Sequence, residues 1–316
     1  MISYEFKSGL AEYIKDYLYL KMLGNYKLTY YEDRFKNLDK WLCKFFPKEI
    51  TITKEMAMEW IHFNSNNLSS GYIRNKAYTI RELAKHIVST GAAAYVLPGF
   101  YLPSVNYRPP HIFSVNEIRQ LLKVASKCHE QLDIKRVTSE YIMYYYIMLL
   151  YVSGMRPGEA RVILKKNVNL DTGSILIEES KGWAARKIVI SQDVCLKLQE
   201  FDSWLNFKIP NRKYFFSIKC DKSLDSTTLS KNFRKICLEA GIIEQPNERV
   251  TLHCLRHTFV SHLIKKWIKN KVDISTRIHY LVVYLGHSDI YSTDYYIHLL
   301  NDDTDALRKV VQKLLH

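Results

Sequence analysis

The stretch that decides the fold of this chain is His253-Cys254-Leu255-Arg256-His257, and the short box Leu285-Gly286-His287 follows it. His253 and Arg256 stand three positions apart, so on a helix they share one face and can address one phosphate group. A guanidinium matches the geometry of a phosphate with two parallel hydrogen bonds. The pair therefore predicts a site for a phosphate ester. His287 is a further candidate for that site, although a histidine after a glycine also suits a capping role.

A second arginine stands far upstream, within Ser153-Gly154-Met155-Arg156-Pro157-Gly158-Glu159. Pro157 suits the first position of a helix, which places Arg156 at a helix entrance where backbone N–H groups also point towards an anion. Glu159, three residues on, can orient the guanidinium. Taken alone, the pair is also explained as a surface ion pair worth under about 1 kcal/mol. Together with the downstream boxes, it favours phosphate binding.

A tyrosine near such a cluster can attack the phosphorus of a DNA backbone, and Tyr296 is the candidate. A free phenol has a pKa near 10, so ionising it at neutral pH costs about 4 kcal/mol. Neighbouring arginines and a histidine lower that cost. The chain holds 23 tyrosines, and Tyr291 and Tyr295 are close rivals. The nucleophile is whichever of them reaches the arginine and histidine cluster.

A predicted β-hairpin supplies a candidate for protonating the leaving oxygen. Residues 174–177 and 186–190 have strand character, and Lys181-Gly182-Trp183 lies in the loop between them. A lysine at a hairpin tip can donate a proton if nearby cations lower its pKa. Lys181 is the candidate and Lys187 is the alternative one strand later. A solvated turn lysine is the plainer interpretation of Lys181 alone.

The sequence offers no pattern typical of a metal site. His253 and His257 have the spacing of a zinc pair, but the metalloprotease version needs Glu after the first histidine, where Cys254 stands. There is no carboxylate cluster arranged to hold magnesium. The six cysteines are scattered without a C-x-x-C pair, which argues against a zinc ribbon or a disulfide scaffold. We expect no metal and no cofactor, with two arginines serving in place of divalent ions.

Composition points to a reduced intracellular setting and a polyanionic partner. The chain has 46 Lys+Arg against 32 Asp+Glu, a formal net charge of +14. Such an excess is typical of nucleic-acid binding, although ribosomal and membrane-surface proteins can share it. The N-terminus lacks the apolar core of a signal peptide, and the most apolar run, 141–155, is too short to span a bilayer. That run predicts a buried helix, and we expect no membrane association.

The chain divides into two predicted parts. Residues 1–100 show helical periodicity in four segments, which predicts a small helical bundle. Residues 101–112 have linker chemistry, with Pro103, Pro109 and Pro110. Residues 113–316 combine helices, expected at 115–128, 138–153 and 157–165, with the hairpin, and everything from residue 192 onward reads as helix and loop. The fold class is mainly α, an α+β arrangement with a small antiparallel sheet.

The ordered set of boxes resembles that of the tyrosine recombinases, the phage integrase family of site-specific DNA recombinases. That family carries an arginine in a T/S-G-x-R-x-x-E segment, a hairpin lysine, an H-x-L-R-H box, an L-G-H box and a tyrosine nine residues beyond the last histidine. Residues 153–159, Lys181, 253–257 and 285–287 match in order, and counting onward selects Tyr296. The resemblance covers 113–316, the catalytic domain. Residues 1–100 resemble, more weakly, the SAM-like core-binding domain that contacts DNA.

The resemblance implies a mechanism without metal or ATP. Tyr296 would attack a scissile phosphate, giving a 3′-phosphotyrosyl link and a free 5′-hydroxyl, and a second strand's 5′-hydroxyl would then attack that link. The phosphate would be held by Arg156, Arg256 and His287.

The remaining matched residues have supporting roles in the same resemblance. His253 would act as general acid/base, Lys181 as general acid to the leaving oxygen, and Glu159 in support. Family members exchange strands within a protein tetramer on two double-stranded DNA sites, through a Holliday junction. The stretch from Arg256 to His287 looks longer than in compact members of the family.

Several expectations lie outside the boxes. Four cations on the predicted helix at 73–87 are candidates for DNA contacts or for a solvated face: Arg74, Lys76, Arg81 and Lys85. The amphipathic segment 305–315 can pack on a neighbour or on its own domain. We expect a cytoplasmic, nucleoid-associated enzyme that integrates or excises a mobile element. The alternatives are a topoisomerase IB-like enzyme and a catalytically inactive architectural DNA-binding protein.

Overall fold

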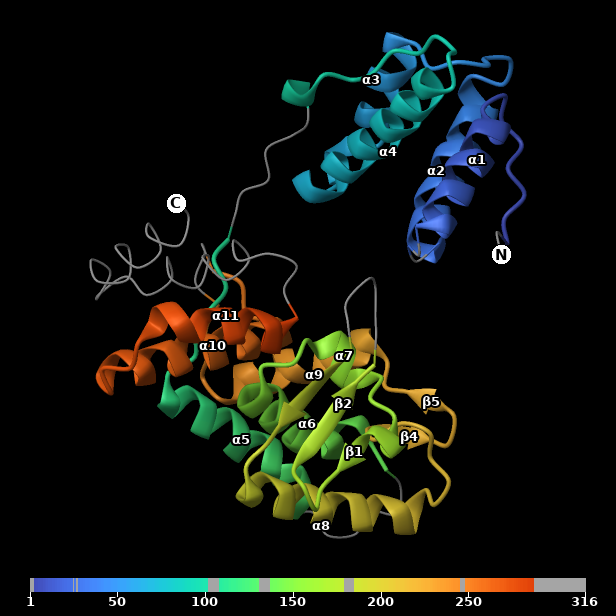
Figure 1. Ribbon diagram of the computed structural model, residues 1–316. Helices are drawn as coiled ribbons and strands as arrows, with labels where there is room; N and C mark the ends of the chain where they lie inside the picture. Colours follow the sequence, from blue (N-terminus) through green and yellow to red (C-terminus); the bar gives the residue numbers. More distant parts are fainter. Residues whose placement is uncertain are drawn as a thin grey trace. The chain divides into compact units, whose positions relative to one another are not determined.

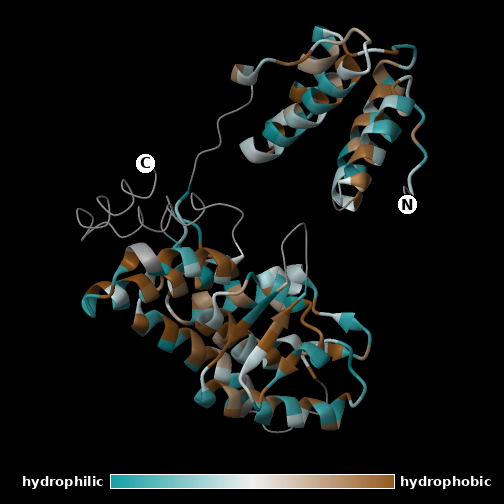
Figure 2. Cartoon of the chain, in the orientation of Figure 1, coloured by the Kyte–Doolittle hydropathy of each residue, from teal (hydrophilic) through white to brown (hydrophobic). Residues whose placement is uncertain are grey.

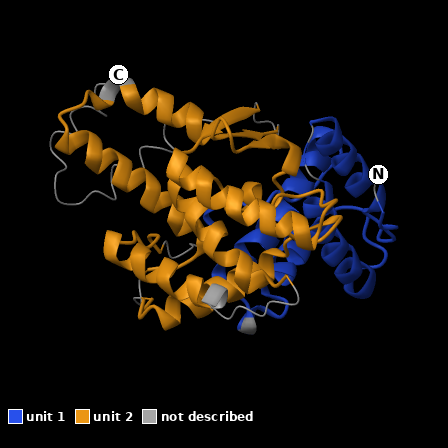
Figure 3. Cartoon of the chain, turned by 90° about the horizontal axis from the view of Figure 1, so that it is seen from below, with its two compact units in different colours: residues 1–107 blue, residues 108–316 orange. Residues whose placement is uncertain are grey.

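The computed structural model describes residues 3–24, 26, 28–101, 108–130, 137–178, 185–244 and 248–286. The chain splits into two compact units, residues 1–107 and 108–316, which Figure 3 shows in blue and orange. Both units are mostly helical, and their helices carry hydrophobic and hydrophilic faces (Figure 2). The fold class predicted from the sequence, mainly helical with a little antiparallel sheet, is confirmed.

Unit 1 is a helical unit built around two long amphipathic helices. Its elements are α1 (Ala11–Leu23), α2 (Leu28–Phe45), α3 (Lys54–His62), α4 (Ser70–Ser89) and two short 3-10 turns, η1 (Ser65–Asn67) and η2 (Gly99–Tyr101). Its core contains Phe35, Leu38 and Trp41 of α2 with Leu83 and Ile87 of α4, all buried. These positions recur at three and four residues, so each helix presents one apolar stripe to the core.

Unit 2 is arranged around one helix, α6 (Ser139–Ser153), shown in Figure 1. It contacts the surrounding helices α5 (Val115–Glu130), α7 (Pro157–Arg161), α8 (Gln192–Lys208), α9 (Ser226–Glu239) and α10 (Leu252–Lys269). Because neighbours cover most of its sides, α6 is apolar nearly all round, and Ile142, Tyr146 and Leu150 are fully buried. The prediction of a buried helix here is confirmed. None of the described helices is long and apolar enough to cross a membrane.

A three-stranded antiparallel sheet, ordered β1-β2-β3, lies beside these helices. Its strands are β1 (Val168–Asn169), β2 (Ser174–Ile177) and β3 (Arg186–Val189). In the β2–β3 hairpin Ile175 pairs with Ile188, and Ile177 pairs with Arg186. Ile175, Ile177 and Ile188 are buried, while Leu176 and Lys187 are exposed, so alternation assigns one face to the core. Arg186 shares the inward face.

Two expectations about secondary structure were wrong. The helix expected over 157–165 ends at Arg161, because the backbone beyond it pairs elsewhere: Phe215 N–H donates to the Ile163 carbonyl oxygen, and Leu164 bridges to Tyr214. The region after residue 192 also contains a second hairpin, β4 (Ser217–Lys219) with β5 (Lys222–Ser223). The pairing of Ile163 and Leu164 joins segments distant in sequence, and the β4–β5 hairpin is short and local. Helical periodicity detects neither of them.

Candidate active site

Arg156 occupies the entrance of α7, as the sequence predicts. It is the N-cap residue, and Pro157 is the first residue of the helix. Its backbone N–H donates to Glu159 Oε2 at 3.0 Å, and its Nη1 donates to Glu159 Oε1 at 2.9 Å. Its Nη2 donates to the carbonyl oxygen of Gly286 at 2.7 Å, 130 residues away in sequence. The Arg156 side chain remains 29% exposed, so a ligand can reach it.

Arg256 comes to the same place from α10. Its Nη1 donates to the Gly154 carbonyl oxygen at 2.9 Å, and its Nη2 donates to that of Leu285 at 2.8 Å. The residue is 1% exposed. It therefore ties the segment before Arg156 to the end of α11 (Ile274–Leu285), the helix that leads into His287.

His253 lies in the first turn of α10, next to this cluster. The residue is exposed, and its ring contacts His257 edge-on at 4.9 Å between centroids. Partial desolvation, followed by the positive charges of Arg256 and Arg156, lowers the pKa of His253 to about 4, against an opposing effect of Glu159. At neutral pH its imidazole is therefore uncharged and can accept a proton.

Arg186 is a residue of this cluster that the sequence analysis missed. Its Nε donates to the Tyr284 carbonyl oxygen at 3.0 Å, and its Nη2 donates to Glu159 Oε2 at 2.6 Å. Burial by itself would raise the pKa of Glu159, but the hydrogen bond and charge of Arg186, and then the hydrogen bonds of Arg156, outweigh it and lower the pKa. The available signal was a charged residue on the inward face of a predicted strand, which needs a buried partner.

Some predicted site residues lie outside the described part of the chain. These are Lys181, His287, the tyrosines at 291, 295 and 296, and the segment 305–315. Lys187, the alternative to Lys181, is exposed on the outward face of β3, opposite to Arg186. That orientation points the Lys187 side chain away from Arg186 and Glu159.

The cations singled out on α4 differ in their surroundings. Lys76 is buried, and its ammonium donates to the Phe63 carbonyl oxygen at 2.6 Å and lies over the Trp60 ring. Arg81 donates to the Leu97 carbonyl oxygen, while Lys85 is exposed and pairs with Glu82 at 2.9 Å. Arg74 lies over the Tyr78 ring. The placement of Lys76 does not support a direct DNA contact, because its charged end points into unit 1.

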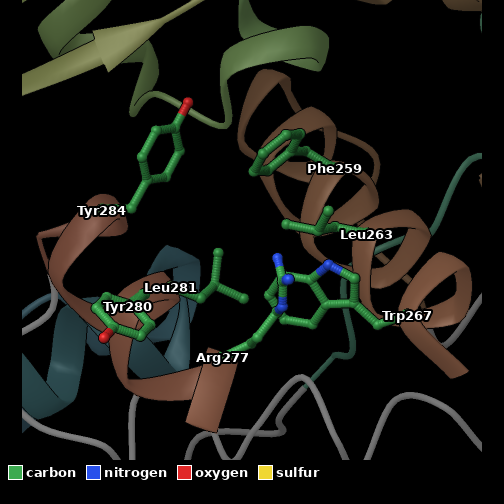
Figure 4. A pocket seen from close by; sticks show the side chains of 7 residues that line it. All are labelled: Phe259, Leu263, Trp267, Arg277, Tyr280, Leu281 and Tyr284. Atoms are coloured by element: carbon green, nitrogen blue, oxygen red, sulfur yellow. The ribbon is translucent and has the colours of Figure 1, made fainter. Parts of the chain in front are cut away.

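An apolar pocket of about 530 Å³ lies between α10 and α11 (Figure 4). Its described lining consists of Phe259, Leu263, Trp267, Arg277, Tyr280, Leu281 and Tyr284. With one charged side chain among aromatic and aliphatic ones, this lining does not suit a phosphate. Within the part of the chain that the structure describes, no group of three or more histidine, cysteine or acidic side chains could hold a metal ion.

Comparison with known proteins gives a family assignment. The model of the phage integrase family matches residues 112–302. The tyrosine recombinase XerD of Rickettsia conorii is 25% identical over 316 residues, covering 96% of each chain. The tyrosine recombinase XerA of Saccharolobus solfataricus is 28% identical over 207 residues, covering 63% of this chain and 59% of the relative.

Solved structures share the fold at low identity. A lambda integrase (75–356) dimer bound to a COC′ core site has a TM-score of 0.63 at 14% identity, covering 90% of this chain and 96% of that one. The Tn1549 transposon integrase in complex with transposon right end DNA also has a TM-score of 0.63, at 15% identity, covering 96% and 99%. Since the family model spans more than half of the sequence, the resemblance seen in the motifs is confirmed: the chain belongs to the phage integrase family of tyrosine recombinases.

Proposed function

We propose that this tyrosine recombinase cleaves and rejoins DNA at a specific site through a 3′-phosphotyrosyl intermediate, and that it integrates or excises a mobile element. The observation that carries the proposal is the convergence of Arg156 and Arg256 at the end of α11, with His253 near enough for both charges to lower its pKa. Those residues come from two helices about a hundred positions apart, and the chain runs from that point directly into His287.

The proposed reaction is a balanced transesterification. The phenolic oxygen of Tyr296 attacks the scissile phosphorus, the bond to the 5′-oxygen breaks, and Lys181 gives that oxygen its proton. Arg156, Arg256 and His287 hold the phosphate as its charge grows in the transition state. A 5′-hydroxyl of another strand then attacks the phosphotyrosine and releases Tyr296. Because one phosphodiester replaces another, the cycle needs neither ATP nor a metal ion.

Two described groups support the proton and charge steps. His253 is uncharged at neutral pH and so has a free lone pair for the proton of the attacking phenol, but its low pKa makes it a weak base, so the step also needs the neighbouring arginines to lower the pKa of the phenol. Glu159 is held ionised between two arginines and so fixes the direction of the Arg156 guanidinium. A preorganised cation of this kind is typically worth a hundred- to thousand-fold in rate, on the order of 3–4 kcal/mol.

The proposed partners are double-stranded DNA carrying a specific site and further copies of this chain. Among proteins of similar fold, a lambda integrase tetramer is bound to a Holliday junction, and the XerH site-specific recombinase is bound to a palindromic difH substrate. By analogy we propose a tetramer in synapsis, acting in the cytoplasm on the nucleoid. The Tn1549 integrase is the analogy for a mobile-element role.

The test is recovery of covalently attached DNA. The full chain is incubated with genomic fragments, adducts are isolated under denaturing conditions, and the attached DNA is sequenced. A nicked suicide duplex carrying the recovered site then traps the intermediate. We expect adducts with the wild type and with Tyr295→Phe, and none with Tyr296→Phe, which still binds the duplex.

Three other outcomes would contradict the proposal. An adduct that persists in Tyr296→Phe but disappears in Tyr295→Phe would show that Tyr295 is the nucleophile. Equal DNA binding by the wild type and Tyr296→Phe, with no adduct from either, would indicate that the protein is a catalytically inactive architectural DNA-binding protein. Relaxation of a supercoiled plasmid that lacks the site would indicate a topoisomerase.

A further inference from the structure

Three arginines from three different elements cap the C-terminal end of α11. Arg186 donates to the Tyr284 carbonyl at 3.0 Å, Arg256 to that of Leu285 at 2.8 Å and Arg156 to that of Gly286 at 2.7 Å. The last carbonyls of a helix lack intrahelical hydrogen-bond donors and carry partial negative charge. A guanidinium group supplies both a donor and a positive charge. Two of these arginines belong to the proposed phosphate site, and Arg186 is the third.

Arg186 is joined to Arg156 by a shared carboxylate. Glu159 accepts from Arg186 Nη2 on one oxygen and from Arg156 Nη1 on the other, at 2.6 and 2.9 Å. The side chains of Arg186 and Glu159 are only 9% and 10% exposed. A buried carboxylate that loses one partner of this kind is strongly disfavoured in its charged form. The charge of Glu159, and with it the orientation of Arg156, therefore depends on Arg186.

Arg186 also packs against the turn that leads into His287. Gly286 has φ +63°, and a Cβ placed on it would lie 3.0 Å from Arg186 Nη1 and 3.2 Å from its Cζ. Arg186 is fixed in turn by strand pairing, opposite Ile177 in β2. It stands five residues after Lys181 along the chain. One side chain thus links the base of the hairpin, the Arg156 pair and the end of α11.

We propose that Arg186 is a positioning residue for DNA strand cleavage: it orients Arg156 through Glu159 and fixes the end of α11 from which His287 follows. The inference rests on the proposed function. Arg186 is nearly buried and donates hydrogen bonds to the Tyr284 carbonyl and the Glu159 carboxylate, so its loss affects the rate of cleavage rather than the affinity for DNA.

The test compares cleavage of the nicked suicide duplex by Arg186→Met, Arg186→Lys and the wild type at saturating protein, between roughly pH 5 and 9. We expect Arg186→Met to bind the duplex like the wild type but cleave it on the order of a hundred-fold more slowly. The acid side of its pH–rate profile should move to higher pH, because Glu159 then takes up a proton more readily. Arg186→Lys should restore much of the profile and part of the rate, since a lysine supplies charge without the second hydrogen bond.

Arg161→Met is the matched control. Arg161 is a half-buried arginine of the same unit that donates to Ser223 Oγ and the Leu224 carbonyl, both at 2.9 Å, so its loss reports on stability. If Arg186→Met does not fold, Arg186→Gln replaces it. An unshifted pH profile with a rate like that of Arg161→Met, or a loss of binding that matches the loss of rate, would overturn the inference.

The two proposals fail differently. A wild type that forms an adduct, with Arg186→Met unaffected, removes only the inference about Arg186. A wild type that forms no adduct removes the proposed function. In that case the carboxyl ¹³C titration of Glu159 in wild type and Arg186→Met still decides whether Arg186 keeps it ionised: a higher midpoint in the variant supports this, and an equal midpoint refutes it.

Discussion

Arg256 Nη1 donates a 2.9 Å hydrogen bond to the carbonyl oxygen of Gly154, 102 residues earlier in the chain. Gly154 ends α6 in the left-handed region, at φ +63°, and Gly286 follows α11 with the same φ. Each glycine thus turns the chain sharply after a helix and offers its carbonyl to one of the two arginines proposed for the phosphate site. The glycines of two motifs are therefore parts of the arginine site, not mere breaks between helices.

Gly154→Ala should destabilise unit 2 more than a left-handed glycine normally does. A Cβ on Gly154 would lie 2.4 Å from Cδ1 and 2.7 Å from Cε1 of Phe259. Gly241 has φ +72° and nothing within 4 Å of a Cβ, so Gly241→Ala measures the backbone cost alone, about 1–2 kcal/mol. Urea unfolding should show an additional loss of about 1–3 kcal/mol for Gly154→Ala, because Phe259 must move. Equal losses would show that Phe259 adjusts freely.

The imidazole of His253 should titrate well below an ordinary histidine. Its folded-state pKa is lowered from 6.5 to about 4, so the unfolded chain takes up a proton first as pH falls. The stability contributed by the neutral ring is complete above about pH 6.5 and is lost as pH falls from there towards 4. Imidazole ¹⁵N chemical shifts should follow this titration, and His253→Gln should lose less stability than the wild type over that range. A midpoint above about 7 would leave the ring mostly protonated at neutral pH and would contradict the proposed proton-accepting state.

Lys76 and Arg74 should differ in their effect on DNA binding. Lys76→Met should leave the salt dependence of binding unchanged, since its ammonium is buried against the Phe63 carbonyl and Trp60. If Arg74 contacts a phosphate, Arg74→Met should reduce the slope of log affinity against log salt by about 0.9. Titrations by fluorescence anisotropy at several salt concentrations measure both slopes. A reduced slope for Lys76→Met would mean that its side chain leaves the core on binding.

Lys181 should be needed only when the leaving oxygen needs a proton. Lys181→Met should slow cleavage of an ordinary suicide duplex, and a duplex with sulfur in place of the 5′-bridging oxygen should restore the rate. A thiol with a pKa of about 8.5 leaves readily as a thiolate, whereas an alkoxide does not. Lys187→Met, on the outward face of β3, should cleave both substrates at wild-type rates. If the sulfur substrate restored the cleavage rate of Lys187→Met and not that of Lys181→Met, Lys187 would be the proton donor to the leaving oxygen.

The sequence predicted much of the fold because its local patterns agree with the tertiary structure. The apolar run at 141–155 became the buried helix α6, and alternating residues became the β2–β3 hairpin. The helix after Pro157 is shorter than its periodicity suggests, because Ile163 and Leu164 pair with the 214–215 segment. Pairing between distant segments adds hydrogen bonds that no local window contains.

By itself the sequence determined the family and the set of candidate residues, because members of this family carry the arginine, histidine and tyrosine motifs in one order along the chain. Only the tertiary structure decided that Arg186 joins Glu159 and the end of α11, and that Lys76 points inward. The physical reason is that the local sequence around a charged residue on a strand or helix does not show which distant residue will pair with it. That partner is set by packing, which must satisfy every charge that burial removes from water.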